Sequence, residues 1–127
     1  MSFPQKSLWI DNSDGTGSHR NPDITDAEFE AGIAAMKDAN VNALWEAATA
    51  YQTGFISNAA FGMVTKGSIL DLPKCKAVEA WVNHIWNDFY YPRKALVTHE
   101  WNPEFYDFSV AGPMPYTVPE LHVEVYA

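Results

Sequence analysis

His84 and Asp88 are the clearest pair of side chains in this sequence that could do chemistry together. They are four residues apart, so on a helix the imidazole and the carboxylate share a face, as an oriented base or a metal-binding pair requires. The same spacing is also typical of a histidine that is hydrogen-bonded for packing, and the neighbouring Trp81 and Ile85 favour that interpretation. The pair therefore receives no catalytic assignment.

Two other segments have the side chains of a metal site without its spacing. His99, Glu100 and Glu104 supply three possible ligands, but the intervening Pro103 spoils their regular spacing and a solvated acidic loop is the favoured interpretation. The segment 12–23 places oxygen side chains at the first, third and fifth positions of a calcium loop and glycine at the sixth. It departs from that loop at Arg20, which adds positive charge at the ninth position, and in lacking the bidentate glutamate. We expect no bound metal.

Motifs that define enzymes are missing. The sequence contains no glycine-rich phosphate loop, no Gly-x-Ser-x-Gly elbow and no cysteine with triad partners. We therefore predict a protein that is not an enzyme, with no catalytic residue and no cofactor. A small enzyme that uses His84 or His99 remains a third hypothesis behind the two given below.

Aromatic side chains are the largest set that could contact a partner. The chain contains five Trp, six Tyr and seven Phe, and such rings are enriched in interfaces. Rings at helical spacing also pack in cores, so whether the aromatic helix is core or interface stays open. The candidate binding residues are Trp81, Trp86, Tyr90, Tyr91, Arg93, Trp101 and Tyr106.

A long helix is expected over 25–55. Thr25 and Glu28 form a capping-box pattern at its start, and apolar residues then recur every three or four positions. Residues 56–66 continue this helix or form a second one, with Gly67 as a C-terminal stop. The predicted packing residues of the helical centre are Phe29, Ile33, Leu44, Val78, Trp81 and Ile85.

A second main helix is expected over 73–91. Pro73 suits a first helical turn, and Pro92 should kink or end the helix because its ring removes a hydrogen bond and clashes with the preceding turn.

Both termini differ from the helical centre. Residues 7–10 are predicted as a short strand, 11–22 as a loop, and 121–125 as a strand because apolar and polar residues alternate there.

The predicted fold class is therefore mainly α, a helical hairpin or small bundle with short β-strands and extended terminal arms. The length favours a single domain over 1–127. Within it we expect an N-terminal arm or loop (1–23), a helical core (24–100) and an extended, proline-rich C-terminal arm (101–127) that mediates association and not the core fold.

Charge and composition exclude several partners. The net charge of −8 disfavours nucleic acid and anionic membrane surfaces. Charge is −5 over 1–65, +2 over 66–97 and −5 over 98–127, so the middle could pair with the ends of the same chain or of a neighbouring copy. No membrane segment or secretory signal is predicted, and Cys75 as the sole cysteine fits an intracellular history.

The block 43–95 resembles small helical proteins of tailed-bacteriophage structural modules, several of them tail-fibre-associated or tail-accessory proteins. The resemblance lies in Lys74, Ala80-Trp81, Ile85-Trp86 and Tyr90-Tyr91 leading to Arg93-Lys94-Ala95. It covers under half of the chain, and the proline-rich tail has no counterpart in it. The resemblance implies a virion structural or tail-assembly role, in a protein made in the host cytoplasm and built into the virion.

Two hypotheses of different classes follow. The first is a bacteriophage virion structural or tail-assembly protein that self-associates as a homo-oligomer or docks on other virion proteins. The alternative is a small-molecule or carbohydrate-binding module that uses exposed Trp and Tyr as stacking platforms. The place in the particle, the oligomer symmetry and the identity of the partner are not specified by the sequence.

Overall fold

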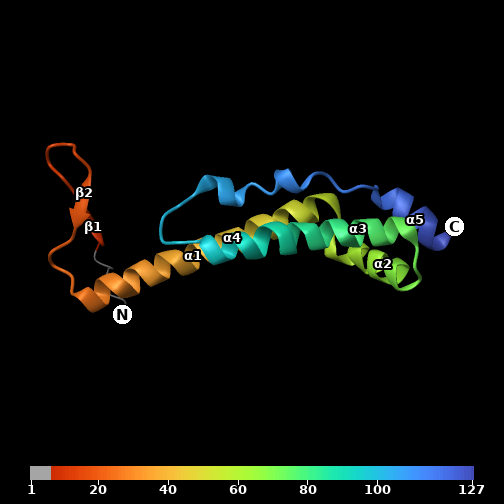
Figure 1. Cartoon of the computed structure of the whole chain (residues 1–127), viewed down its shortest axis with the longest axis horizontal. Coiled ribbons are helices and arrows are strands. Elements are labelled where there is room, and N and C mark those ends of the chain that lie inside the picture. The colour runs from red at the N-terminus through yellow and green to blue at the C-terminus, as the bar shows by residue number, and fades with distance from the viewer. Residues whose placement is uncertain (1–6) are drawn as a thin grey trace.

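The computed structural model describes residues 7–127, so the first six residues of the expected N-terminal arm lie outside the described residues. The fold is mainly α, as the sequence predicts, and the molecule is elongated (Figure 1). Its elements are β1 (Trp9–Asp11), β2 (Ser18–Arg20), α1 (Asp26–Phe55), α2 (Asn58–Ile69), α3 (Pro73–Asn83), the π-helix η1 (His84–Tyr90), α4 (Tyr91–Leu96), the 3-10 turns η2 (Pro103–Tyr106) and η3 (Ser109–Ala111), and α5 (Val118–Tyr126). None of the described helices combines the length and the apolar character needed to cross a membrane.

Helix α1 begins at the predicted capping box. The Thr25 hydroxyl accepts a hydrogen bond from the Glu28 amide at 3.1 Å, and the Glu28 carboxylate accepts one from the Thr25 amide at 3.0 Å. The two halves of α1 have different surroundings. Leu44 and Ala48 in its second half are buried in the core, whereas its first half projects from the helical body towards the hairpin (Figure 1).

Gly67 is not the stop that the sequence predicts. It lies inside α2 and is buried against α3. The helix ends at Ile69, and Asp71 follows in the left-handed conformation with φ of 60°. The Asp71 amide donates to the Ser68 carbonyl and the Leu72 amide to the Gly67 carbonyl, at 3.0 and 2.9 Å. This pair of bonds is a Schellman motif, which satisfies the last carbonyls of the helix.

Pro92 does not end the aromatic helix. The helix runs from α3 through η1 into α4, antiparallel to α1. In η1 the hydrogen bonds span five residues, as in the bond from the Tyr91 amide to the Trp86 carbonyl. The wider π turn leaves room for the ring of Pro92. Pro92 lies in the first turn of α4, where the N–H that proline lacks is not needed for a helical hydrogen bond.

The C-terminal segment is a packed part of the fold, so the expectation of an arm separate from the core is wrong. It runs alongside the helical body (Figure 1), and Phe108 and Leu121 belong to the buried core. The predicted strand at 121–125 is a helix. Thr117 and Glu120 form a second capping box that starts α5, and the helix then packs the buried Leu121 and the partly buried Val125 against α2 and α3. The free energy gained from this packing outweighs the preference of the alternating sequence for a strand.

The N-terminal strand prediction is confirmed at β1, but the expected loop contains β2. Trp9 pairs with Arg20 and Asp11 with Ser18 in an antiparallel hairpin. Gly15 and Gly17 take positive φ in its turn. The segment that resembles a calcium loop therefore folds as a hairpin, in which Asp14 accepts hydrogen bonds from the amide and hydroxyl of Thr16.

The core lies between the second half of α1, α2, α3, η1 and the C-terminal segment. Of the six predicted packing residues, Leu44, Val78, Trp81 and Ile85 are buried there. Phe29 and Ile33 are only half-buried and lie outside this core, because they belong to the projecting half of α1.

Candidate binding surface on the projecting half of α1

The projecting half of α1 has an apolar face that no other helix of the described chain covers. Phe29, Ile33, Met36 and Asn40 follow one another at spacings of four, three and four, which places them on one side of a helix. That side continues to the buried Leu44. We call Phe29, Ile33 and Met36 the α1 seam. Because α4 ends at Leu96 and the chain turns away, the seam is left half-exposed, and Met36 has 38 % of its surface in solvent.

The hairpin packs on one edge of the seam. The Trp9 ring meets the Phe29 ring edge-on, with centroids 5.3 Å apart, and the Arg20 guanidinium lies 4.4 Å from the centre of the same ring. Arg20 also pairs with Asp26 at 2.6 Å. Gly32 allows this close approach, because a Cβ there would lie 2.5 Å from a methyl of Leu8. The hairpin thus holds Trp9 beside the seam.

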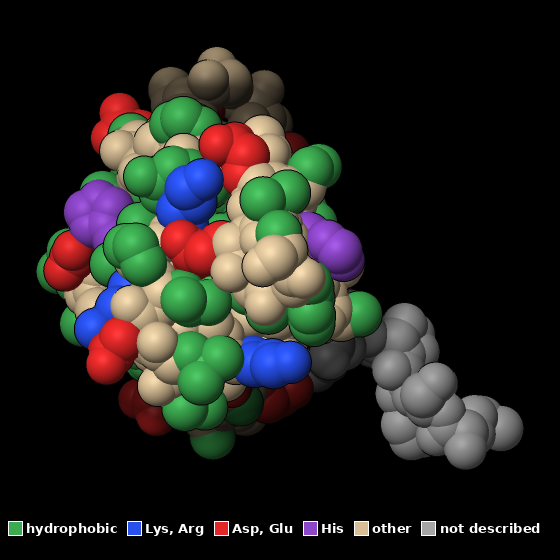
Figure 2. All heavy atoms as spheres, turned by 90° about the vertical axis from the view of Figure 1, so that its right-hand side faces the viewer, with side chains coloured by type: hydrophobic (Ala, Val, Ile, Leu, Met, Phe, Trp, Pro, Cys, Tyr) green, Lys and Arg blue, Asp and Glu red, His purple; other side chains and the backbone are tan. Residues whose placement is uncertain are grey.

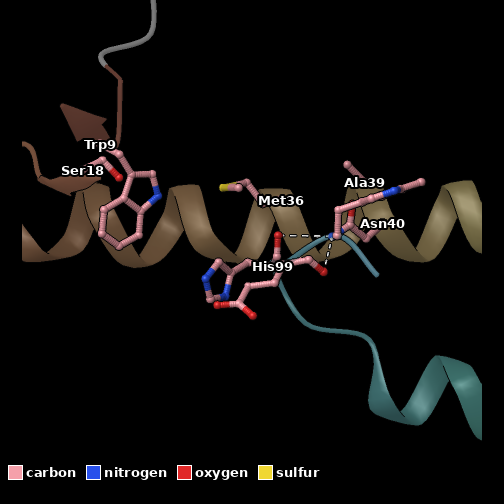
Figure 3. A pocket seen from close by; sticks show the side chains of 8 residues that line it. Trp9, Ser18, Met36, Ala39, Asn40 and His99 are labelled. Atoms are coloured by element: carbon pink, nitrogen blue, oxygen red, sulfur yellow. Dashed lines mark hydrogen bonds between the residues drawn. The ribbon is translucent and has the colours of Figure 1, made fainter. Parts of the chain in front are cut away.

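The segment 97–101 borders the other end of the seam. The side-chain amide of Asn40 donates to the carbonyl oxygens of Thr98, His99 and Glu100 at 3.0, 3.2 and 3.4 Å, and Figure 3 draws the last two of these bonds. The hydroxyl of Tyr106 donates to the Asn40 carbonyl at 3.1 Å. Asn40 therefore anchors the segment 97–101 to α1.

Trp101 lies on this anchored segment as a rigid, exposed ring. It stacks on Tyr106 with ring centroids 3.8 Å apart and planes 10° apart, and 58 % of its surface is exposed. Burial raises the pKa of the Tyr106 hydroxyl, which stays protonated as a donor at neutral pH. One face of Trp101 is thus held in place by Tyr106.

Two hollows flank the seam. The first, of about 550 Å³, lies on the Met36 side between the hairpin and the segment 97–101 (Figure 3) and is lined by Trp9, Ser18, Met36, Ala39, Asn40, His99, Glu100 and Trp101. The second, of about 370 Å³, lies on the Ile33 side and is lined by Phe29, Glu30, Ile33, Ala34, Lys37, Val97, Thr98 and His99. His99 lines both.

The second hollow has an apolar floor and two opposite charges. Glu30 and Lys37 are both exposed, and no ion pair joins either of them to another described residue. They are seven residues apart on one face of α1, a distance of about 10 Å along the helix axis. That separation is too long for an ion pair between them.

Across residues 7–127 no group of three or more His, Cys, Asp or Glu side chains could hold a metal ion. His99, Glu100 and Glu104 do not form such a group. His84 and Asp88 meet, with Nδ1 and Oδ2 2.5 Å apart, but both are exposed on the outer face of η1.

Two of the seven predicted binding residues lie at this surface and five lie in the helical body. Trp101 borders the first hollow and Tyr106 supports it. Trp81 is buried and donates from Nε1 to the Gly112 carbonyl at 2.9 Å. Trp86 is half-buried and donates to Gln52 at 2.8 Å, and its ring meets that of the buried Tyr90.

Tyr91 and Arg93 complete the set. Tyr91 is 56 % exposed, with its ring edge against Tyr90. Arg93 donates from Nη1 to the carbonyls of Phe105 and Asp107, both at 2.8 Å, and so fastens the C-terminal segment to α4. Burial lowers the pKa of Arg93, and the charge of Asp107 counteracts that shift.

Sequence reasoning did not identify as binding residues five that line these hollows, Trp9, Glu30, Met36, Lys37 and Asn40, and it considered His99 only as a metal ligand or catalytic residue. Phe29 and Ile33 were assigned to the core. The signal that distinguishes them lies within the helical stripe itself: Glu30 and Lys37 fall on the same side as the buried Leu44 and Ala48, where a fully covered helix would carry apolar residues.

The opposite end of the molecule also exposes apolar side chains, in another arrangement. Ile69, Leu70, Val123 and Tyr126 are each more than half exposed there. Figure 2 shows hydrophobic side chains at this end interspersed with Lys, Arg, Asp and Glu side chains. Isolated apolar side chains of this kind are ordinary on a protein surface.

Comparisons with protein-family models, with curated proteins and with solved structures give no match to this chain.

Proposed function

We propose that this chain is a non-catalytic structural protein that works by association, through the α1 seam and the exposed rings beside it, with copies of itself or with other virion proteins. The observation that carries the proposal is the projecting half of α1. A helix that leaves the body with an apolar face half-exposed gains free energy when a partner removes that face from water.

The resemblance of residues 43–95 to tail-accessory proteins supports a place in a bacteriophage virion, with a role in the tail or in its assembly. The elongated shape fits such a role, because a rod presents separate contact surfaces at its two ends (Figure 1). The aromatic helix that carries the resemblance supplies the packed body from which α1 projects.

Sedimentation velocity of the full chain over a wide range of concentrations tests the association. We expect Ile33→Asp to shift the chain towards monomer, because a carboxylate in the seam must be desolvated in the complex. The matched control is Ala35→Asp, an exposed position on the other side of α1, which should leave the mass unchanged. A chain that stays monomeric at every concentration and binds no virion protein contradicts the proposal.

A second candidate function is favoured by the first hollow. Trp101, held by Tyr106, and Trp9, 42 % exposed, border a hollow that also contains the polar side chains of Asn40, His99 and Glu100. Rings beside hydrogen-bonding groups are typical of saccharide sites. Tryptophan fluorescence in a titration with oligosaccharides tests this function, and a response that Trp101→Ala abolishes while the chain remains monomeric would favour it over assembly.

A further inference from the structure

We infer that the partner of the α1 seam is a second copy of this chain, bound antiparallel so that Glu30 of each copy meets Lys37 of the other. This inference names the partner in the association proposed above and rests on it. It makes the oligomer a two-fold dimer whose contact lies on the projecting half of α1.

The spacing of the seam is that of a coiled-coil contact. With Phe29 and Met36 at d positions and Ile33 and Asn40 at a positions, the 4-3-4 pattern matches a heptad. Glu30 and Lys37 then both occupy e positions. They flank the seam on one side only.

The flanks decide the orientation of the second copy. In a parallel pair the e flank of one helix faces the g flank of the other, and the g residues here are Gly32 and Ala39, which carry no charge. In an antiparallel pair, turning one helix round brings the two e flanks together. Only the antiparallel arrangement gives the charges of Glu30 and Lys37 a partner.

The register follows from the same two charges. A two-fold axis between Ile33 and Ala34 places Glu30 opposite Lys37 of the second copy and, by symmetry, Lys37 opposite its Glu30. Two reciprocal ion pairs result, and neither charge is paired within the described chain. The same axis brings Ile33 and Ala34 of the second copy over the apolar floor of the second hollow.

The shape of the molecule allows this contact. The uncovered stretch of α1 lies between the hairpin at its start and the helical body (Figure 1). The hairpin packs on the g flank, through Leu8 against Gly32, and leaves the e flank open at the second hollow. Two such stretches can cross antiparallel with each e flank facing its copy.

Charge reversal tests the pairing directly. Glu30→Lys places two lysines on the flank and Lys37→Glu places two glutamates there, so each variant alone should dimerise at least about tenfold more weakly than the wild type. An equimolar mixture of the two variants should form a heterodimer of wild-type strength, and the double reversal should restore the homodimer. Sedimentation equilibrium measures all four. The control is Glu46→Lys, the same charge change on the far side of α1.

Engineered cysteines test the orientation. Under mild oxidation a mixture of Glu30→Cys and Lys37→Cys should form a disulfide between the two variants, while Glu30→Cys alone should not link to itself. Native Cys75 gives a low background, because burial, followed by the hydrogen bond to Glu124 and its charge, raises the pKa of that thiol to about 11. Self-linking of Glu30→Cys would place the two-fold axis at residue 30 instead of between Ile33 and Ala34 and overturn the inference, as would a mixture that forms no link.

The failures of this inference and of the proposed function are distinguishable. If the wild type dimerises but the mixed reversals bind no better than each variant alone, association stands and the antiparallel seam is wrong. If the wild type is monomeric and a different virion protein binds the seam, a second copy is not the partner. A monomer that associates with nothing overturns both.

Discussion

Gly67 is a residue at which helices α2 and α3 approach each other closely. A Cβ at this position would lie 2.2 Å from the sulfur of Cys75 and 2.7 Å from its Cβ, inside any permitted contact. Both residues are buried. The absence of a side chain at Gly67 therefore sets the distance between the two helices, a role unrelated to helix termination.

We expect Gly67→Ala to destabilise the fold by about 1 to 3 kcal/mol, because the added methyl forces the two helices apart. Gly62→Ala in the same helix has open space around it and should stabilise by about 0.5 to 1 kcal/mol through helix propensity. Urea denaturation of both variants gives the comparison. Equal effects at the two positions would show that α2 and α3 do not make this contact.

At the scale of single residues the sequence predicted the buried identity of Leu44, Val78, Trp81 and Ile85, because apolar side chains at helical spacing have few alternatives. It did not predict the role of Gly67. A glycine near a helix end is consistent with both a stop and a close approach, and only the position of Cys75 in space distinguishes the two.

At the scale of elements, α5 and α3 are joined by one carboxylate. Leu72, at the start of α3, has no side chain that can cap the helix. Glu124 of α5 caps it instead, by accepting hydrogen bonds from the amides of Lys74 and Cys75 at 2.9 and 3.0 Å. Burial by itself would raise the pKa of Glu124, but these amide hydrogen bonds outweigh it and the pKa is lowered. The charged form is thus favoured by folding.

This lowered pKa predicts a pH dependence. The contribution of Glu124 is fully present above the pKa of an unfolded glutamate, about 4.3, and is lost as the pH falls through the lower folded value. We expect Glu124→Gln to lower the melting temperature at pH 7 and to make little difference near pH 2. Glu46→Gln, exposed on α1, is the control. A deficit in the Glu124→Gln variant that persists unchanged at pH 2 would show that charge is not its cause.

The sequence predicted helix starts better than helix continuations. The capping box at Thr25 and the proline at Pro73 are local signals, and both were interpreted correctly. Pro92 and the segment 121–125 were not. The first is accommodated by a π turn and the second is helical through contacts with α2 and α3, and neither cause lies in the adjacent sequence.

At the scale of the whole molecule the C-terminal segment closes the core. The Gly112 carbonyl accepts hydrogen bonds from both Tyr51 and Trp81, and Phe108 and Leu121 are buried. We therefore expect deletion of 101–127 to abolish cooperative thermal unfolding, the opposite of what an association arm predicts. A truncated chain that kept the helical circular dichroism and a sharp melt would restore the arm hypothesis.

The same closure can be tested with single substitutions. Leu121→Ala should cost about 2 to 5 kcal/mol, since it leaves a cavity in the core. Val123→Ala, on the exposed side of α5, should change stability by less than about 0.5 kcal/mol. Chemical denaturation of the full-length variants gives both values.

The candidate surface could be predicted from the sequence only in part. Trp101 and Tyr106 were identified because aromatic rings in a proline-rich segment would be costly to leave in water. The α1 seam was identified as an apolar stripe but assigned to the core, since a stripe does not show where its covering helix ends. That information resides in Leu96 and the turn that follows it, some sixty residues away along the chain.

The continuity of α1 means that one helix spans two regions of different local stability. Beyond Asn40 it buries Leu44 and Ala48 in the core, so its hydrogen bonds there should open mainly with the whole fold, whereas before Asn40 they are backed by little more than the hairpin. In the free monomer the first turns therefore fray in equilibrium with the folded state. A second copy that covers the seam would suppress this fraying, so that dimerisation would complete the folding of a helix that each monomer holds only at one end.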